Sequence, residues 1–160
     1  MTIKVGDKIP SVTLKYMEES GAKEVSTDEL FKGKKVLLFA VPGAFTPACS
    51  NQHLPGYIQN AEQIKAKGVD TIACISVNDV FVMDAWGKNQ NAGDKVLMLA
   101  DGDGEFAKAA GLELDLTGKG LGMRSQRYAM VIEDATVKEL ELEDGGKLEI
   151  STAEKLLAKL

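Results

Sequence analysis

One of the two cysteines lies in a segment whose residue types favour a reactive thiolate. Residues 35–41 form an apolar run typical of a buried parallel strand, and Pro42 ends it. Thr46 is suited to be the N-cap of a following helix, and Pro47 to be its first residue. Cys49 then falls in the first helical turn, where unpaired backbone N–H groups and the helix dipole favour a negative charge. The sequence therefore predicts that Cys49 is a nucleophilic thiolate.

A thiolate in this position is suited to the reduction of peroxides. The sulfur attacks one peroxide oxygen and is oxidised, while the other oxygen leaves as hydroxide or alkoxide. Hydrogen-bond donors placed for the developing charge lower that barrier, and the Thr46 hydroxyl, the backbone N–H groups and an arginine would supply them. The chain has 19 basic residues, of which only Arg124 and Arg127 are arginines. Taken alone, a cysteine in the first turn of a helix is more often inert, so the prediction rests on the combination of Pro42, Thr46 and Cys49.

The elements that must position this segment alternate between strands and helices. A polar–apolar alternation over residues 11–16 predicts a strand, followed by a charged turn at 18–23. Ser26 and Glu29 form a capping box that predicts a short helix, ended by Gly33. Further strands are expected at 35–41, 70–77, 96–100, 128–133 and 136–142, and helices at 47–67 (with a kink at 55–56), 81–89, 105–110 and after a cap at 151 or 152.

This order of elements predicts the fold class α/β, with a thioredoxin-like fold in which helices flank a central mixed β-sheet. We expect one domain over residues 1–160, because no linker or repeat divides the chain. In such sheets ligands bind beyond the carboxyl ends of the strands, which is where Cys49 falls. The glycine-rich stretch 117–122 lacks a phosphate-binding pattern and is expected to be a flexible approach to the strand that follows Arg127.

The cysteine segment resembles the peroxiredoxin signature Pro-x-x-x-Thr/Ser-x-x-Cys, which Pro42, Thr46 and Cys49 fill. The likeness to the type II (peroxiredoxin-5-like) branch is carried by the longer stretches 41–56, 74–82 and 124–131 and runs in register over nearly the whole chain. It implies a thiol-dependent peroxidase that reduces hydrogen peroxide and alkyl hydroperoxides, with peroxynitrite as a further candidate substrate. The intermediate would be a sulfenic acid, and no metal or organic cofactor would be required.

The resemblance also implies the roles of individual residues. Cys49 resembles the peroxidatic cysteine, and Thr46 resembles the residue whose hydroxyl holds the peroxide. Pro42 resembles the residue that shields the sulfur from water. Arg127 resembles the guanidinium that polarises the peroxide and supports the thiolate. For Arg124 two interpretations remain open, a supporting role at the substrate and an ion pair with an acidic side chain.

His53 and Phe45 are further candidates for the site. His53 lies four residues after Cys49, on the same helix face. A Cys–His pair as in cysteine hydrolases is an alternative function, but no third group that would orient the histidine is evident. A supporting role for His53, implied by the resemblance, and a structural role remain open. Phe45, with Pro42 and Phe81, could form an apolar wall that selects organic peroxides, or belong to the packing or to a dimer surface.

Cys74 lies within residues 71–77, a strand expected to be buried on both faces, and is interpreted as a structural core residue. A thiol in mid-strand is poorly placed for a disulfide with Cys49, since the two Cα atoms must come within ~7 Å. Some type II peroxiredoxins carry a resolving cysteine in the C-terminal third, where residues 147–152 of this chain have none. We therefore expect no resolving cysteine and a one-cysteine cycle, regenerated by glutathione with glutaredoxin or by thioredoxin.

A thioredoxin-fold module that senses or binds without efficient turnover is the alternative function, because the second redox cysteine is missing. The absence of a C-x-x-C motif disfavours a disulfide reductase. Two cysteines and one histidine leave few ligands for a metal site, and none is expected.

Charge, hydropathy and the amino-terminal residues indicate which partners and which cellular location to expect. The net charge of −5 disfavours nucleic acid and anionic lipid as partners. No apolar run approaches the ~20 residues that a membrane span requires. The amino terminus shows no secretory signal, so we expect a cytoplasmic location, with an organelle as the alternative if a transit peptide has been removed. The resemblance implies a homodimer.

Overall fold

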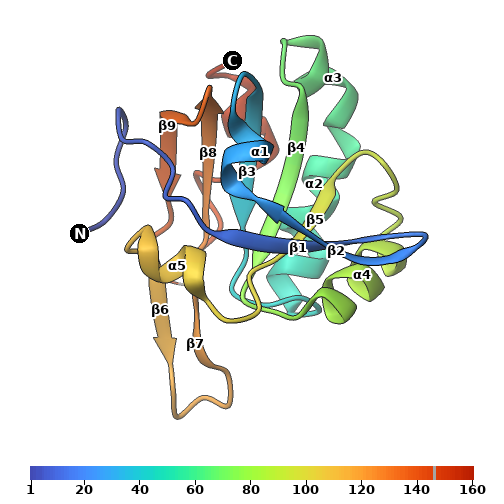
Figure 1. Ribbon diagram of the computed structural model, residues 1–160, viewed down its shortest axis with the longest axis vertical. Coiled ribbons are helices and arrows are strands. Elements are labelled where there is room, and N and C mark those ends of the chain that lie inside the picture. Colours follow the sequence, from blue (N-terminus) through green and yellow to red (C-terminus); the bar gives the residue numbers. More distant parts are fainter. Residues whose placement is uncertain (146) are drawn as a thin grey trace.

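The computed structural model describes residues 1–145 and 147–160, and a mixed β-sheet is their central layer (Figure 1). In this part of the chain the sheet has seven strands, in the order β2-β1-β5-β4-β3-β8-β9. The three central strands β3, β4 and β5 are parallel, and the outer strands are antiparallel to their neighbours. The strands are β1 (Thr13–Glu18), β2 (Gly21–Ser26), β3 (Lys35–Ala40), β4 (Thr71–Ser76), β5 (Leu97–Ala100), β8 (Tyr128–Glu133) and β9 (Thr136–Leu142).

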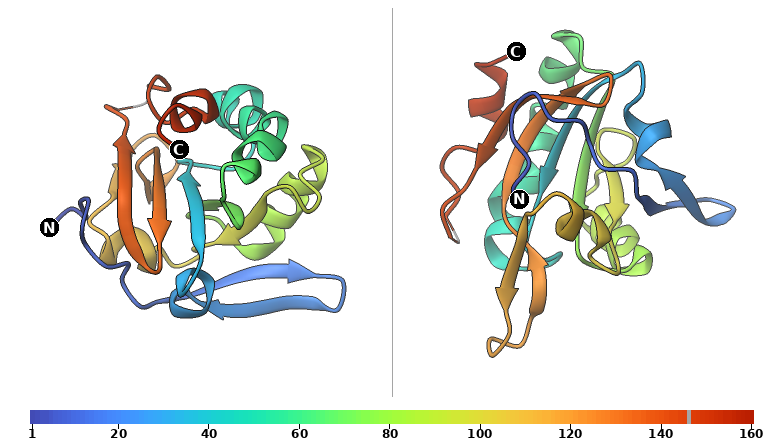
Figure 2. Two further views of the ribbon diagram at one scale, coloured as in Figure 1. Left: turned by 90° about the horizontal axis from the view of Figure 1, so that it is seen from above. Right: turned by 60° about the vertical axis from the view of Figure 1, so that its left-hand side comes forward.

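Helices cover both faces of this sheet (Figure 2). One face packs against the π-helical segment η1 (Cys49–His53), α2 (Leu54–Gln59), α3 (Ala61–Ala66), α4 (Val80–Asn89) and α6 (Ala153–Leu157). The other face packs against α1 (Thr27–Phe31), α5 (Glu105–Ala109) and the amino-terminal segment. Side chains of β3 enter the two cores alternately, because successive residues of a strand point to opposite faces. The predicted thioredoxin-like α/β fold is confirmed.

Local sequence signals located several elements correctly. The Ser26 hydroxyl accepts a hydrogen bond from the Glu29 N–H (3.1 Å) at the start of α1, as the capping box predicts. Asp134 and Ala135 connect β8 to β9 with positive φ angles of 48° and 64°, as a two-residue hairpin turn of the right twist requires. At the final helix the cap is Thr152, whose hydroxyl accepts from the N–H of Lys155.

Two strand pairs were not predicted from the sequence. The expected charged turn at 18–23 is shorter, because β2 begins at Gly21 and pairs with β1 along its whole length. The glycine-rich stretch is the turn of a second hairpin, formed by β6 (Glu113–Leu116) and β7 (Gly122–Ser125), and not an unstructured approach to Arg127. Most residues of β2, β6 and β7 are exposed or half-buried, so these strands lack the apolar runs that mark the buried ones.

The helix expected at 47–67 is divided, and a π turn lies directly before the predicted kink at 55–56. It begins at Pro47, and within η1 the Leu54 N–H donates to the carbonyl of Cys49, five residues earlier. Pro55 has no N–H to donate and directly follows this π turn. A further break, which was not predicted, lies at Asn60 (φ −99°, ψ 7°), between α2 and α3.

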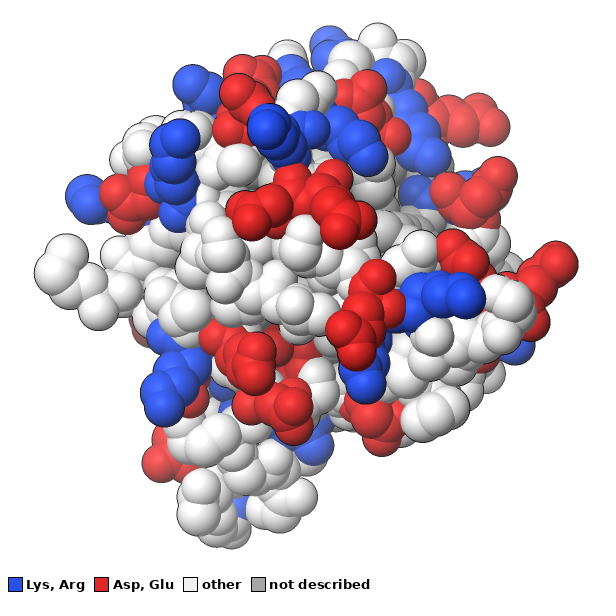
Figure 3. Space-filling model, viewed as in Figure 1, with Lys and Arg blue, Asp and Glu red and all other residues white. Residues whose placement is uncertain are grey.

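The surface carries both signs of charge. On the face shown in Figure 3, basic and acidic side chains are interspersed rather than gathered into one basic area. Within the described part of the chain, no helix is long and apolar enough to cross a membrane.

Candidate active site

The loop that joins β3 to η1 places Pro42, Thr46 and Cys49 at the carboxyl end of a central strand. The carbonyl of Thr46 accepts from the Ser50 N–H (2.9 Å), so Thr46 occupies the N-cap position, as predicted. The Thr46 side chain does not cap the helix, however. Its hydroxyl donates to the carbonyl of Gly43 (2.7 Å), which closes a turn and leaves the hydroxyl oxygen with a free lone pair.

A second loop, between β4 and α4, holds this turn in place. The side-chain oxygen of Asn78 accepts from the Ala44 N–H (3.0 Å) and from the Ser76 hydroxyl (2.7 Å). Next to Ala44, Phe45 has a φ of 64°, in the left-handed region that residues other than glycine rarely occupy. The Phe45 ring is 52% exposed and lies 6.4 Å from the ring of buried Trp86. The turn before Cys49 is thus a strained conformation that a neighbouring side chain stabilises.

The sulfur of Cys49 is fully buried and has a charged neighbour. Arg127, which is 3% exposed, enters from the residue before β8, and its Nη2 donates to Cys49 Sγ over 3.1 Å. The guanidinium is permanently charged, so it stabilises a thiolate at this distance. The Nε of Arg127 is buried and donates to no protein atom in residues 1–145 and 147–160. The sulfur is therefore not enclosed by apolar packing alone.

The same guanidinium contacts His53. Its Nη1 lies 2.8 Å from His53 Nδ1, and because arginine only donates, Nδ1 is the acceptor. The other ring nitrogen, Nε2, carries the proton and donates to the carbonyl of Ser151 (3.0 Å). Burial, and next the charge of Arg127, lower the pKa of His53 to about 3. His53 is thus neutral near pH 7, and both ring nitrogens are occupied, so it is not the base of a hydrolase-type pair.

Three residues behind His53 were not found from the sequence. The hydroxyl of Tyr57 donates to the carbonyl of Ser151 (2.7 Å), and the Ser151 hydroxyl donates to Glu143 (2.7 Å). Glu143 lies opposite Arg127 at the end of the β8–β9 ladder, where its N–H donates to the Arg127 carbonyl (3.0 Å). The nearest signal in the sequence was the predicted β8–β9 hairpin, which brings the residues after β9 close to those before β8.

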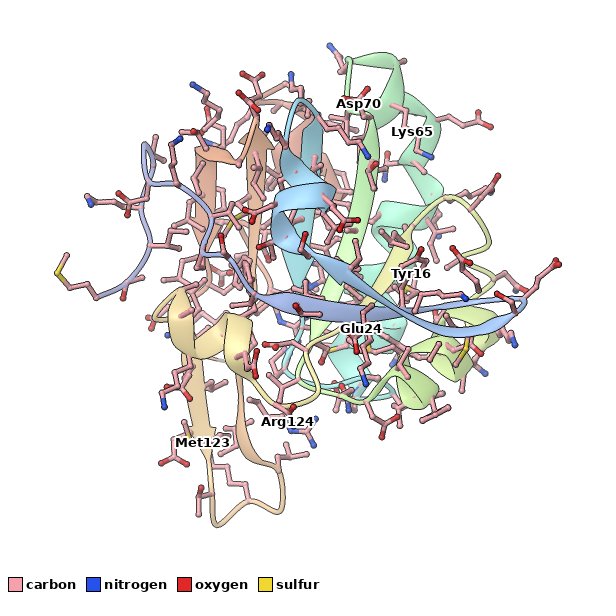
Figure 4. All side chains as sticks on the ribbon, viewed as in Figure 1. Tyr16, Glu24, Lys65, Asp70, Met123 and Arg124 are labelled. Carbon is pink, nitrogen blue, oxygen red and sulfur yellow. The ribbon has the colours of Figure 1, made fainter. Side chains whose placement is uncertain are left out.

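Arg124 lies beside the cysteine loop rather than on the sulfur. It is half-buried, and its Nη1 and Nε donate to the carbonyls of Val77 (3.1 Å) and Leu121 (2.8 Å). Figure 4 shows Arg124 and its neighbour Met123 on opposite sides of β7, as alternation in a strand requires. In residues 1–145 and 147–160 Arg124 forms no ion pair with an acidic side chain; its bonds join the β6–β7 hairpin to the loop that contains Asn78.

Cys74 lies in the middle of β4, fully buried, in the same core as Cys49. Burial, and next the neighbouring Cys49, raise the pKa of the Cys74 thiol well above its ordinary value. Cys74 is thus a protonated thiol packed between the sheet and the helices. Both cysteines are free thiols in the structure.

A cysteine thiol beside a buried arginine, at the carboxyl end of a mixed thioredoxin-like sheet, defines a thiol-based redox protein. The family model described as Redoxin matches residues 4–157. The chain is 52% identical to Peroxiredoxin-2E, chloroplastic, of Arabidopsis thaliana, over 99% of this chain and 70% of that protein. It is also 52% identical to Peroxiredoxin-2C of Oryza sativa subsp. japonica, over 99% and 98%.

Solved structures agree with these relatives. The crystal structure of reduced Prx3 in complex with H2O2 from Vibrio vulnificus is similar at a TM-score of 0.96 and 54% identity, covering 99% of both chains. Peroxiredoxin 5 from Alvinella pompejana follows at a TM-score of 0.86 and 41% identity, covering 98% of this chain and 96% of that one. The chain belongs to the Redoxin family and within it to the type II, peroxiredoxin-5-like peroxiredoxins. It is a thiol-dependent peroxidase.

Proposed function

We propose that Cys49 is the peroxidatic cysteine, that Thr46, Arg127 and Pro42 complete its site, and that the catalytic cycle uses this one cysteine. The observation that carries the proposal is the contact of Arg127 Nη2 with Cys49 Sγ at 3.1 Å. A permanent cation at hydrogen-bond distance favours negative charge on the sulfur that attacks the peroxide. The relative from Vibrio vulnificus whose structure contains H2O2 supports hydrogen peroxide as a substrate.

In the first step the Cys49 thiolate attacks one oxygen of ROOH. The S–O bond forms as the O–O bond breaks; sulfur loses two electrons, and the departing RO⁻ takes up a proton to become ROH. Arg127 stabilises the charge that moves from sulfur to the departing oxygen, and its unpartnered Nε is a donor that remains for a peroxide oxygen. The Thr46 hydroxyl also holds the peroxide, since its oxygen has a free lone pair that can accept a hydrogen bond from the peroxide O–H.

Two residues of the loop before Cys49 are candidates for the wall of the substrate entrance. Pro42 is half-buried in the same loop, and Phe45 is exposed beside Thr46. We propose that Pro42 keeps water from the sulfur and that Phe45 is one wall of the entrance, where it favours organic hydroperoxides. Arg124 supports the entrance from the hairpin side through its bond to Val77.

The second half of the cycle uses external thiols. The sulfenic acid on Cys49 condenses with a reductant thiol to form a mixed disulfide and water, and a second thiol releases the Cys49 thiol as the reductant disulfide forms. Cys74 does not serve as the resolving cysteine, because its buried thiol stays protonated and the thiolate is the attacking species. Glutathione with glutaredoxin, or thioredoxin, are the proposed reductants, and no cofactor takes part.

The test compares the two cysteines. Cys49→Ser should abolish peroxide-dependent oxidation of the reductant, whereas Cys74→Ala should retain it, with glutaredoxin/glutathione and thioredoxin systems compared as donors. Intact mass after one equivalent of hydrogen peroxide should show one added oxygen in Cys74→Ala and none in Cys49→Ser. Undiminished turnover by Cys49→Ser would refute the assignment. Loss of turnover in Cys74→Ala, with the fold retained, would refute the one-cysteine cycle.

The same mass experiment distinguishes the peroxidase from the alternative function, a redox-sensing module. A redox-sensing module would form the oxidised species and keep it in the presence of every reductant system. The contact between Arg127 and the sulfur favours turnover, because a guanidinium also lowers the barrier of the attack itself.

We propose that the protein forms a homodimer, as the resemblance to type II peroxiredoxins implies. Phe45 and Phe81 are 52% and 69% exposed, and a second copy of the chain would cover such side chains. Sedimentation at several concentrations tests this, and a monomer throughout would remove the proposal.

A cytoplasmic location is likewise proposed for a chain whose relatives include a chloroplastic peroxiredoxin. Imaging of a fluorescent fusion to the native amino terminus and one to the carboxyl terminus would detect import into an organelle.

A further inference from the structure

Behind His53 lies a buried carboxylate, Glu143, that the peroxidase chemistry does not explain. Glu143 is 4% exposed, and its Oε2 accepts four hydrogen bonds at 2.7–2.9 Å. The donors are all in the segment that leads into α6: the N–H groups of Glu149, Ile150 and Ser151 and the hydroxyl of Ser151. Burial by itself raises the pKa of Glu143, but these bonds outweigh it, so the pKa lies below its ordinary value.

The carboxylate fixes the position of one backbone carbonyl. Ser151 is bonded to Glu143 through both its N–H and its hydroxyl, so its own carbonyl oxygen is held in a single direction. That oxygen accepts from His53 Nε2 (3.0 Å) and from the Tyr57 hydroxyl (2.7 Å). A carbonyl only accepts, so it requires the proton of His53 to be on Nε2.

The tautomer of His53 in turn decides where Arg127 points. With the proton on Nε2, Nδ1 is free to accept from Arg127 Nη1 (2.8 Å), and this bond leaves Nη2 directed at Cys49 Sγ (3.1 Å). A proton on Nδ1 would face a guanidinium N–H donor and would displace Arg127 from the sulfur.

We propose that Glu143 is a positioning residue of the peroxidase: through Ser151 it fixes the His53 tautomer and thereby the orientation of Arg127 at Cys49. The inference rests on the proposed function, since it takes Arg127 and Cys49 as the reacting pair. The backbone of Glu143 reinforces the arrangement, because its N–H donates to the carbonyl of Arg127 itself.

The chain offers a direct readout, since His53 is its one histidine and Trp86 its one tryptophan. Long-range ¹H–¹⁵N spectra of ¹⁵N-histidine-labelled protein report the tautomer of His53 without assignment. Trp86 Nε1 donates to the hydroxyl of Ser50 (3.0 Å), next to Cys49, so we expect its fluorescence in stopped flow to report the oxidation of Cys49. For the wild type we expect a neutral His53 protonated on Nε2 between pH 5 and 8. A proton on Nδ1 would overturn the proposal before any variant is made.

Variants of Glu143 distinguish a role in positioning Arg127 from a role in folding alone. Glu143→Ala should lower the second-order rate constant with hydrogen peroxide about tenfold and alter the His53 nitrogen signals. Glu143→Gln should restore most of the rate, because one oxygen carries all four bonds and an amide oxygen can take its place. Glu141→Ala is the matched control: it removes a carboxylate of β9, two residues before Glu143, that binds Lys159 (2.8 Å), and it should leave the rate and the signals unchanged.

The possible results distinguish a failure of the positioning role of Glu143 from a failure of the proposed peroxidase site. If folded Glu143→Ala keeps the wild-type rate and His53 signals, the positioning role is wrong. If Glu143→Ala does not fold, Glu143→Asp, whose carboxylate is one methylene shorter, should show the same changes to a smaller degree, and wild-type values in that variant would be equally decisive against it. An Arg127→Lys variant that retains the full rate would instead contradict the proposed function, whatever Glu143 does.

Discussion

The two sides of the Cys49 sulfur are built in different ways. On one side, the turn before the cysteine is made by neighbours in sequence, such as the Thr46 hydroxyl on the Gly43 carbonyl, and is partly exposed. On the other side, Arg127 and His53 are buried, and the bond between Arg127 and Cys49 joins residues 78 positions apart. Local hydrogen bonds can hold a loop that admits a substrate. A buried charge needs fixed partners on every side, and only distant segments of the chain provide them.

This difference predicts that the buried side tolerates substitution least. Arg127→Lys keeps the charge but not the fork that reaches both Cys49 and His53. We expect its second-order rate constant with hydrogen peroxide to fall about 100-fold, as when a preset donor is removed from a reaction centre. Arg124→Lys, which alters bonds to backbone carbonyls only, should lose less than about tenfold. Stopped-flow fluorescence measures both rate constants. Equal losses in the two variants would contradict the difference between the buried and the exposed side of the sulfur.

An intermediate effect is expected where a distant residue stabilises the local turn. Asn78→Ala removes the acceptor of the Ala44 N–H, next to the strained Phe45, and should lower the rate constant about tenfold. Asn89→Ala, at the exposed end of α4, is the control and should have no effect. A wild-type rate for Asn78→Ala would mean that the turn needs no support from the neighbouring loop.

The buried side should also determine the response to acid. The folded-state pKa of His53 is about 3 against an ordinary 6.5, so between these values the unfolded chain binds a proton that the folded chain does not. The contribution of His53 to the free energy of unfolding is then fully present above pH 6.5. It decreases as the pH falls, by up to about 1.4 kcal/mol per pH unit. His53→Gln lacks this titration, so its urea-unfolding free energy should depend less on pH between 6.5 and 4.5. The same slope in both proteins would contradict a buried neutral histidine.

The smallest effect is expected from a conservative change on the local side. Thr46→Ser keeps the hydroxyl that donates to the Gly43 carbonyl and loses one methyl group. The rate constant with hydrogen peroxide should change less than about threefold, within the range of a single weak contact. A larger loss in the same stopped-flow assay would show that packing, as well as the hydroxyl, holds the turn.

The sequence by itself determined the local features of this protein. The apolar run before Pro42, the helix start at Thr46, the capping box and the β8–β9 turn each depend on residues a few positions apart, and each lies where the pattern indicates. The resemblance to type II peroxiredoxins singled out Arg127 for the same reason, since a short motif surrounds it. Residues close together in the chain remain close in any fold, so their joint chemistry can be predicted without knowledge of the tertiary structure.

Only the tertiary structure decided what surrounds these features. A β-bulge between Val131 and Ile132 shifts the β8–β9 register by one residue, which brings Glu143 rather than Leu142 opposite Arg127. The neutral state of His53 likewise arises from burial and from Arg127, 74 positions away in the chain. A one-residue shift turns each side chain of a strand to the other face, and local propensity carries no signal strong enough to reveal it.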